Sequence, residues 1–283
     1  MRIAGREIGQ GLPPFLIAEA SINHNGSLER ALDMVKAAKD AGCDAVKFQT
    51  FHAEDVCSPD QIATYESQGK TITELRINIF KRAQLSDKAW PTIKEECDKQ
   101  GIIFLSTPET PRDLDLLLKV GMPAIKIGSD NLTNLPMLRY CARDDVGLPI
   151  LLSIGMATIE DFDAAIGATM GSNLVVMVCT SQYPCPPACA NLRRIKEYGT
   201  YKGFSDHTTT TTAAVMAVAL GACVFETHFT LDRNLPGPEH SWARTFTQLE
   251  KWECAIKAAH TMLGDGEIKP GAGYWVNAKA SPS

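Results

Sequence analysis

Two kinds of segment alternate along most of this chain. Short apolar runs rich in β-branched and aliphatic residues are typical of strands that are buried on both faces. Eight such runs are present, at residues 15–21, 44–50, 102–107, 124–129, 149–154, 173–180, 201–206 and 222–229. The pattern therefore predicts eight parallel strands.

The segments between these runs carry apolar residues at helical spacing, as in LERALDMVKAAKDAG, DLDLLLKVG and TAAVMAVALG. These three segments end in Gly42, Gly121 and Gly221, where a helix C-terminus favours a left-handed residue. No G-x-G-x-x-G motif follows the first run, and eight strand and helix units favour a closed barrel over an open sheet. The sequence predicts a single (β/α)8 TIM barrel over residues 1–266.

Two stretches depart from this alternation. Residues 51–85 are rich in Gln, Thr, Glu and Lys and lie between the second run and the next helical segment. We expect this stretch to be an excursion over the barrel mouth. Residues 267–283 are rich in Gly, Ala and Pro and show no periodicity, which predicts a loosely ordered tail.

Composition and charge narrow the range of partners. The hydrophobic fraction of 45% and the charged fraction of 22% are those of an ordinary soluble globular protein. The net charge is -5 and the signs are mixed along the chain, so nucleic acid is a poor partner. No apolar stretch is long enough for a membrane span, and the N-terminus lacks the apolar core of a signal peptide. We expect a cytoplasmic protein.

The nine cysteines are scattered, and several lie inside apolar runs. This distribution favours buried reduced thiols over disulfides. Cys185 and Cys189 flank two prolines in YPCPPAC, a spacing unlike that of common zinc ligands.

Polar residues recur where the predicted strands end, and in such barrels the carboxyl ends of the strands form the active site. Lys47 and Lys126 lie in otherwise apolar runs, so each needs an anionic partner to offset its desolvation. That partner is either a carboxylate such as Glu19 or Glu226, or a bound anion. Hydroxyl groups at neighbouring strand ends favour the anion, and phosphoenolpyruvate fits; these are Thr107, Ser129, Ser153 and Ser205.

Two histidines, His207 and His228, end consecutive strands, which are neighbours in a barrel. Each is either a hydrogen-bonded structural residue or a ligand that presents its imidazole to a shared ion. A mixed nitrogen and oxygen site with open positions suits Mn²⁺, Mg²⁺, Fe²⁺ or Co²⁺, and zinc also fits.

Taken together, these segments resemble the N-acetylneuraminate (sialic acid) synthase family. The resemblance runs from about Phe15 to Gly266. It is carried by IAEASINHNG (17–26), DAVKFQT (44–50), STPET (106–110), KIGSDNLTNLP (126–136), LSIGMAT (152–158), CTSQYPCPP (179–187), GFSDHT (203–208) and ETHFTLDRNLPGPEH (226–240).

The resemblance implies a role for each matching residue. Glu19, Lys47 and Lys126 fall on catalytic positions, and Glu19 is the carboxylate that positions or deprotonates the attacking water. The phosphoenolpyruvate-binding positions are Lys47, Thr107, Lys126, Ser129, Ser153 and Ser205, and the sugar-side positions are Gln49, Asn131, Ser181, Tyr183 and Glu239. His207 and His228 fall on the ligands of a divalent metal, with Mn²⁺ or Mg²⁺ implied.

In this scheme the metal polarises the open-chain aldehyde of an N-acylated hexosamine similar to N-acetylmannosamine. The methylene carbon of phosphoenolpyruvate attacks the aldehyde, water adds to the resulting oxocarbenium carbon, and phosphate leaves. The product is a nonulosonic (sialic-type) acid. The implied partners are the two substrates and, by the same resemblance, a second copy of the chain in a homodimer.

The chain departs from the family pattern mainly on the acceptor side. After KIGS the family usually has Gly followed by Glu or Asp, and here the pair is Asp130 and Asn131. Glu239 stands where Asp is usual, Ile154 where Thr is usual, and Ser181 where some members have Asn.

The family normally continues into a C-terminal antifreeze-like domain that supplies an arginine to the sugar, and this sequence stops before it. Arg233 or Arg244 replaces that arginine, or the sugar is bound differently. Alternatively, a separate partner supplies the domain, or the sequence is part of a longer chain.

Two other functions compete with synthesis. One is a barrel that keeps the anion site without turnover and acts as a sensor or assembly partner. The other is a lyase that forms a Schiff base on Lys47 or Lys126.

Overall fold

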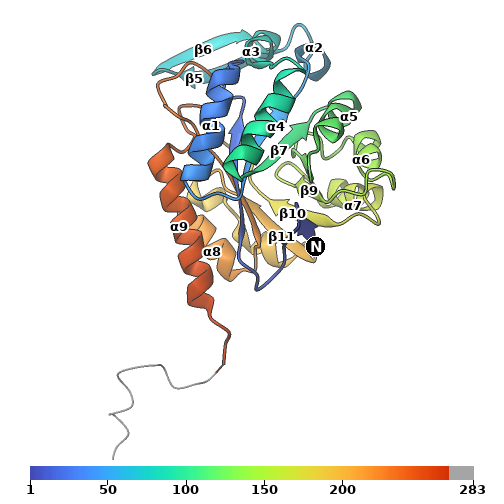
Figure 1. Ribbon diagram of the computed structural model, residues 1–283, viewed down its shortest axis with the longest axis vertical. Coiled ribbons are helices and arrows are strands. Elements are labelled where there is room, and N and C mark those ends of the chain that lie inside the picture. Colours follow the sequence, from blue (N-terminus) through green and yellow to red (C-terminus); the bar gives the residue numbers. More distant parts are fainter. Residues whose placement is uncertain (268–283) are drawn as a thin grey trace, which may run out of the picture.

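The computed structural model describes residues 1–267, and its main sheet consists of eight parallel strands (Figure 1). They are β3 (Phe15–Ser21), β4 (Ala45–Thr50), β7 (Ile103–Pro108), β8 (Ile125–Ile127), β9 (Ile150–Ser153), β10 (Leu174–Val178), β11 (Tyr201–Ser205) and β12 (Val224–His228). Each lies within two residues of the range expected from the apolar pattern.

The strand order is β7-β4-β3-β12-β11-β10-β9-β8. The end strands β7 and β8 lie against each other without a hydrogen-bonded ladder, so the barrel is closed in packing and nearly closed in hydrogen bonding. The predicted (β/α)8 TIM barrel is confirmed.

Helices cover the outside of the barrel (Figure 1). They are α1 (Leu28–Asp40), α4 (Ala89–Gln100), α5 (Pro111–Val120), α6 (Leu135–Cys141), α7 (Ile159–Ala168), α8 (Thr212–Ala219) and α9 (Phe246–Leu263). The three glycines expected after helices, Gly42, Gly121 and Gly221, all have positive φ.

One unit of the barrel lacks its α-helix. After β10 the described chain forms two short 3-10 turns, η1 (Pro187–Cys189) and η2 (Leu192–Lys196). Three prolines, Pro184, Pro186 and Pro187, occupy this connection. Each removes a backbone donor and disfavours helical geometry in the preceding residue, which accounts for the missing helix.

The stretch 51–85 forms a separate layer at the carboxyl ends of the strands, at the top of Figure 1. It contains α2 (Ala53–Val56), a hairpin of β5 (Ile62–Ser67) and β6 (Lys70–Leu75), and α3 (Arg76–Ala83). A small apolar cluster of Ile22, Phe51, Ile79 and Ala83 holds this layer down. Since several of its residues line the cavity at the barrel mouth, the expected excursion is confirmed.

A short N-terminal hairpin covers the opposite end of the barrel. It pairs β1 (Arg2–Ile3) with β2 (Arg6–Glu7), and its Ile3 side chain is fully buried in the main core. Arg6 pairs with Asp44 just before β4, which fixes the hairpin at the amino ends of the strands. The hairpin therefore occupies the amino ends of the strands and leaves the carboxyl ends for a ligand.

Three further expectations bear on the described part of the chain. All nine cysteines lie within residues 1–267, and none of them is in a disulfide. No helix in this part combines the length and apolar character needed to cross a membrane. The tail expected at 267–283 lies, from residue 268 onward, outside the described residues.

Candidate active site at the carboxyl ends of the barrel strands

A cavity of about 1010 Å³ lies at the carboxyl ends of the strands. Its lining includes almost every site residue predicted from the sequence: Glu19, Lys47, Gln49, Thr107, Lys126, Ser129, Ser153, Ser181, Tyr183, Ser205, His207, His228 and Glu239. Asn131 is not among the lining residues. The fold therefore brings the predicted residues of at least seven strands to one place, while their individual roles remain predictions.

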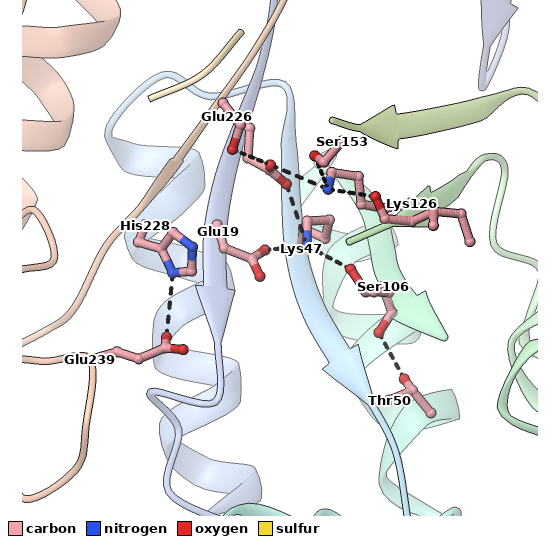
Figure 2. Close-up of polar contacts among 12 residues, drawn as sticks. Glu19, Lys47, Thr50, Ser106, Lys126, Ser153, Glu226, His228 and Glu239 are labelled. Atoms are coloured by element: carbon pink, nitrogen blue, oxygen red, sulfur yellow. Dashed lines mark hydrogen bonds and ion pairs between the residues drawn. The ribbon is translucent and has the colours of Figure 1, made fainter. Parts of the chain in front are cut away.

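Lys47 lies at the centre of the polar network in this cavity (Figure 2). Its partner in the β3–β4 ladder is Glu19, whose own partner on β12 is His228, so three adjacent strands direct these side chains to one face. The Nζ atom lies 2.8 Å from Glu19 Oε2 and 3.4 Å from Glu226 Oε1. It also donates a hydrogen bond of 2.8 Å to Thr107 Oγ1. The buried ammonium therefore has three oxygen partners.

Lys126 reaches the same network from β8, which is separated from the Lys47 strand by β7 (Figure 2). Its Nζ atom donates to Ser153 Oγ at 2.8 Å and lies 3.6 Å from Glu226 Oε2. Ser205 donates to the same Glu226 oxygen at 2.7 Å. Glu226 thus joins both lysines and a hydroxyl group, although it is only 3% exposed.

The two buried carboxyl groups beside Lys47 have opposite pKa shifts. Burial raises the pKa of Glu19 to about 7, and the nearby Glu226 adds to the rise while Lys47 opposes it. Burial also acts to raise the pKa of Glu226, but Lys126, Lys47 and the Ser205 hydroxyl outweigh it and hold that pKa well below its usual range. Glu226 is therefore the permanent counter-charge, and Glu19 is able to exchange a proton near neutral pH.

The pKa of Lys47 is raised, because attraction to Glu19 and Glu226 outweighs the lowering effect of burial. A lysine that forms a Schiff base attacks as the neutral amine and needs a lowered pKa. The observed environment favours a permanently charged Lys47 that binds an anion.

His207 and His228 lie side by side at the ends of the neighbouring strands β11 and β12, with ring centroids 5.5 Å apart. His207 Nδ1 is hydrogen bonded to the Thr180 carbonyl oxygen at 2.8 Å, which leaves Nε2 near Ser205 Oγ at 3.3 Å. The Tyr183 ring lies against His207, with centroids 4.4 Å apart. Burial lowers the pKa of His207 to about 4, so its imidazole is neutral at neutral pH, as a metal ligand requires.

His228 Nδ1 lies 3.3 Å from Glu239 Oε2, and both atoms are buried without a hydrogen-bond partner in the described part of the chain (Figure 2). Within residues 1–267, no group of three or more His, Cys, Asp or Glu side chains has the arrangement of a metal site. The two imidazoles and the orphaned carboxylate oxygen nevertheless have the chemistry of a mixed nitrogen and oxygen donor set. The residues fit a divalent cation that keeps open positions for substrate or water.

The hydroxyl groups of Ser129, after β8, and Ser181, after β10, are hydrogen bonded to each other at 2.8 Å. Asn131, predicted at the sugar, instead donates from Nδ2 to Glu109 Oε2 at 2.7 Å. Both Glu109 and Asp130 line the cavity.

Sequence reasoning did not assign several lining residues to the site. Glu226 was considered only as an ion-pair partner of the lysines, yet it contacts both. Glu109 lies in the STPET motif two residues after Thr107. Its position just after a strand end is the sequence feature that could have assigned it to the site. Arg76, on the layer over the mouth, and Trp242 also line the cavity, and nothing local in the sequence marks them.

Arg233 and Arg244, the two possible replacements for the arginine of the family's C-terminal domain, differ in whether they can reach a bound sugar. Arg244 is buried, and its guanidinium donates to Asp206 at 2.9 Å and to the Thr208 carbonyl oxygen at 2.9 Å. It holds the loop after β11 and does not line the cavity, so it does not replace that arginine. Arg233 lines the cavity, but its guanidinium already donates to the Ala243 carbonyl oxygen and to Gln248.

Comparison with known proteins gives a consistent result. The model of the NeuB family matches residues 34–268. The chain is 35% identical to the N,N'-diacetyllegionaminic acid synthase of Legionella pneumophila over 93% of this chain and 76% of that protein. It is 30% identical to the human N-acetylneuraminate-9-phosphate synthase over 92% of this chain and 74% of that protein.

A solved structure is similar over nearly its whole length. It is the N-acetylneuraminic acid (sialic acid) synthetase of Leptospira borgpetersenii in complex with citrate, with a TM-score of 0.85 and 30% sequence identity. The superposition covers 96% of this chain and 92% of the Leptospira chain.

Proposed function

This chain belongs to the NeuB family, and from that premise we propose that it condenses phosphoenolpyruvate with an N-acylated hexosamine to give a nonulosonic acid and inorganic phosphate. The observation that carries the proposal is the pairing of two buried lysines with strand-end hydroxyl groups in one cavity, beside two neighbouring imidazoles. We further propose that the protein acts as a homodimer.

We assign phosphoenolpyruvate to the wall formed by Lys47 and Lys126. Thr107 and Ser153 each already receive a hydrogen bond from one of these lysines, so their hydroxyl hydrogens are free to turn toward an anion. Ser129 adds a further hydroxyl donor, and Ser205 lines the same wall with its hydroxyl hydrogen donated to Glu226 until an anion takes that place. A phosphate or carboxylate entering this wall gains charge-assisted hydrogen bonds from both lysines.

We assign the proton transfer to Glu19. Its carboxylate pairs with Lys47, and its neighbour in the β3–β12 ladder is His228. Its pKa of about 7 suits a group that holds or accepts a proton at neutral pH. In the proposed reaction the enol double bond of phosphoenolpyruvate supplies the electron pair that joins its methylene carbon to the acceptor aldehyde carbon. The aldehyde C=O π bond opens and its oxygen takes a proton to become a hydroxyl group. Glu19 then takes a proton from the water that adds to the former enol carbon, and phosphate leaves from that carbon as the added hydroxyl loses its proton and becomes the ketone.

We assign the divalent cation, Mn²⁺ or Mg²⁺, to His207 and His228. When bound, the cation would supply Lewis-acid polarisation of the acceptor carbonyl. The hydrogen bond from His207 to the Thr180 carbonyl oxygen orients that ring toward the cavity, a typical arrangement for a ligating imidazole.

The decisive experiment is an acceptor panel with purified protein, phosphoenolpyruvate and a series of divalent metals. N-acylated, bis-acylated and phosphorylated hexosamines are each assayed for phosphate release and for product mass. We expect release to require metal, phosphoenolpyruvate and one sugar together. Stabilisation by phosphoenolpyruvate with no phosphate release from any acceptor would replace the synthase with a binding protein.

A further inference from the structure

A chain of hydrogen bonds holds one carboxyl group at the cavity wall, on the connection after β7, the strand between those that carry Lys47 and Lys126. Asn134, the N-cap residue of α6, donates from Nδ2 to Asn131 Oδ1 at 3.2 Å. Asn131 in turn donates from Nδ2 to Glu109 Oε2 at 2.7 Å. The Glu109 amide donates to the Thr50 carbonyl oxygen at 3.2 Å, so both ends of this residue are fixed.

Asn131 has used both ends of its amide within this chain, and it does not line the cavity. Glu109 does line the cavity, and no protein partner is recorded for its second carboxyl oxygen within residues 1–267. The polar group that this wall presents to a ligand is therefore the Glu109 carboxyl. Asn131 serves to hold it in one orientation.

The charge around Glu109, which is partly exposed, differs from that around the buried Glu19 and Glu226. Glu19 and Glu226 each lie beside a lysine, whereas Glu109 has no salt bridge among the described residues. Asp130, the next carboxyl group on this wall, adds a repulsive charge. Burial first, and then Asp130, raise the pKa of Glu109 to about 8, while the charges of Lys47 and Lys126 act to lower it. A carboxyl group in this state both donates and accepts hydrogen bonds.

We propose that Glu109 is an acceptor-specificity residue, which binds an uncharged hydroxyl or acylamino substituent of the sugar, and that Asn131 is its positioning residue. This inference rests on the proposed function. A buried polar group that hydrogen bonds one substituent discriminates strongly against analogues that lack it, because the group is then left unpaired. A wall of two carboxyl groups also disfavours an anion at the same point.

The test compares Glu109→Gln, Glu109→Ala and Asn131→Ala with the unaltered protein. The matched control is Glu96→Gln, which removes a partly exposed carboxylate on α4 that pairs with Lys99 and is not among the residues lining the cavity. With an acceptor that the protein turns over, we expect Glu109→Ala to raise the acceptor KM at least about tenfold. The KM for phosphoenolpyruvate and the Kd for phosphoenolpyruvate by calorimetry should stay within twofold.

Asn131→Ala should raise the acceptor KM by a smaller factor, with the phosphoenolpyruvate constants unchanged. Asn131→Asp, which replaces the donor with a second repelling carboxylate, should exceed the effect of Asn131→Ala. For at least one deoxy or deacylated analogue of the acceptor, the penalty of Glu109→Ala should shrink below twofold, and that analogue identifies the substituent.

Acceptor KM values within twofold of the unaltered protein for both Glu109 variants would overturn the inference and leave the synthase intact. If no acceptor sugar leads to phosphate release, the proposed function is refuted, and the role of Glu109 needs a separate test. Acceptor binding by calorimetry with phosphoenolpyruvate present then decides the role of Glu109. Equal acceptor affinity in the unaltered protein and Glu109→Ala, or no binding to either, would overturn it.

Discussion

Replacing Glu226 with glutamine removes the one carboxylate that contacts both buried lysines and keeps the shape of the side chain. Its oxygens lie 3.4 Å from Lys47 Nζ and 3.6 Å from Lys126 Nζ. At an effective dielectric constant of about 20, each attraction is about 5 kcal/mol. The desolvation of the carboxylate, several kcal/mol, is no longer incurred in the variant and offsets part of this loss. We expect a net loss of about 3–5 kcal/mol in the free energy of unfolding.

The same substitution should strengthen the response to phosphoenolpyruvate, because the ligand then supplies the negative charge that Glu226 supplied. The assay is urea unfolding of Glu226→Gln and of the unaltered protein, each with and without saturating phosphoenolpyruvate. The ligand should restore more stability to the variant than it adds to the unaltered protein. Glu96→Gln, at a surface ion pair with Lys99, should change the free energy of unfolding far less than Glu226→Gln does. A loss under about 1 kcal/mol in Glu226→Gln, or an equal gain from the ligand in both proteins, would refute the charge balance described above.

Further substitutions test separate parts of the site and its support. Glu19→Gln should lower kcat about 100-fold or more with phosphoenolpyruvate affinity retained, measured by phosphate release and calorimetry; an equal loss of affinity would make Glu19 only a partner of Lys47. His207→Ala should abolish bound Mn²⁺ in metal analysis, and an unchanged metal content would refute the ligand assignment. Arg244→Met should cost about 3–5 kcal/mol in urea unfolding, since it leaves buried Asp206 without its cation, whereas Arg2→Met at an exposed pair should cost almost nothing. Burial lowers the pKa of His24 to about 4, below its ordinary value of 6.5, so the stability it contributes is present above about pH 6.5 and is lost as pH falls toward 4. His24→Asn should therefore lessen the loss of stability between pH 7 and pH 5, by at most about 2 kcal/mol; an unchanged pH dependence would contradict the shift.

The barrel could be predicted because its strands are buried on both faces, and that burial leaves a continuous apolar run in the sequence. The hairpin of β5 and β6 was not predicted within the excursion, because its strands IATYES and KTITEL lack a regular alternation of apolar and polar residues. The local signal is confined to the turn, where Gln68 and Gly69 have positive φ. A search for long buried runs misses such a pair, because its strands are half exposed.

The lysine side of the site could also be predicted, since a lysine inside an apolar strand needs an anionic partner wherever the strand lies. The acceptor side follows a different logic. Whether Asn131 faces a ligand or another side chain depends on Glu109, a residue from the connection after a neighbouring strand, and no local pattern encodes that pairing. The strands β7 and β8 are in contact but share no hydrogen-bonded ladder. No register between these strands therefore fixes how the loops that follow them are placed relative to each other. The substitutions that distinguish one acceptor from another are therefore expected to concentrate at this seam, where side-chain contacts between loops decide which group faces the cavity.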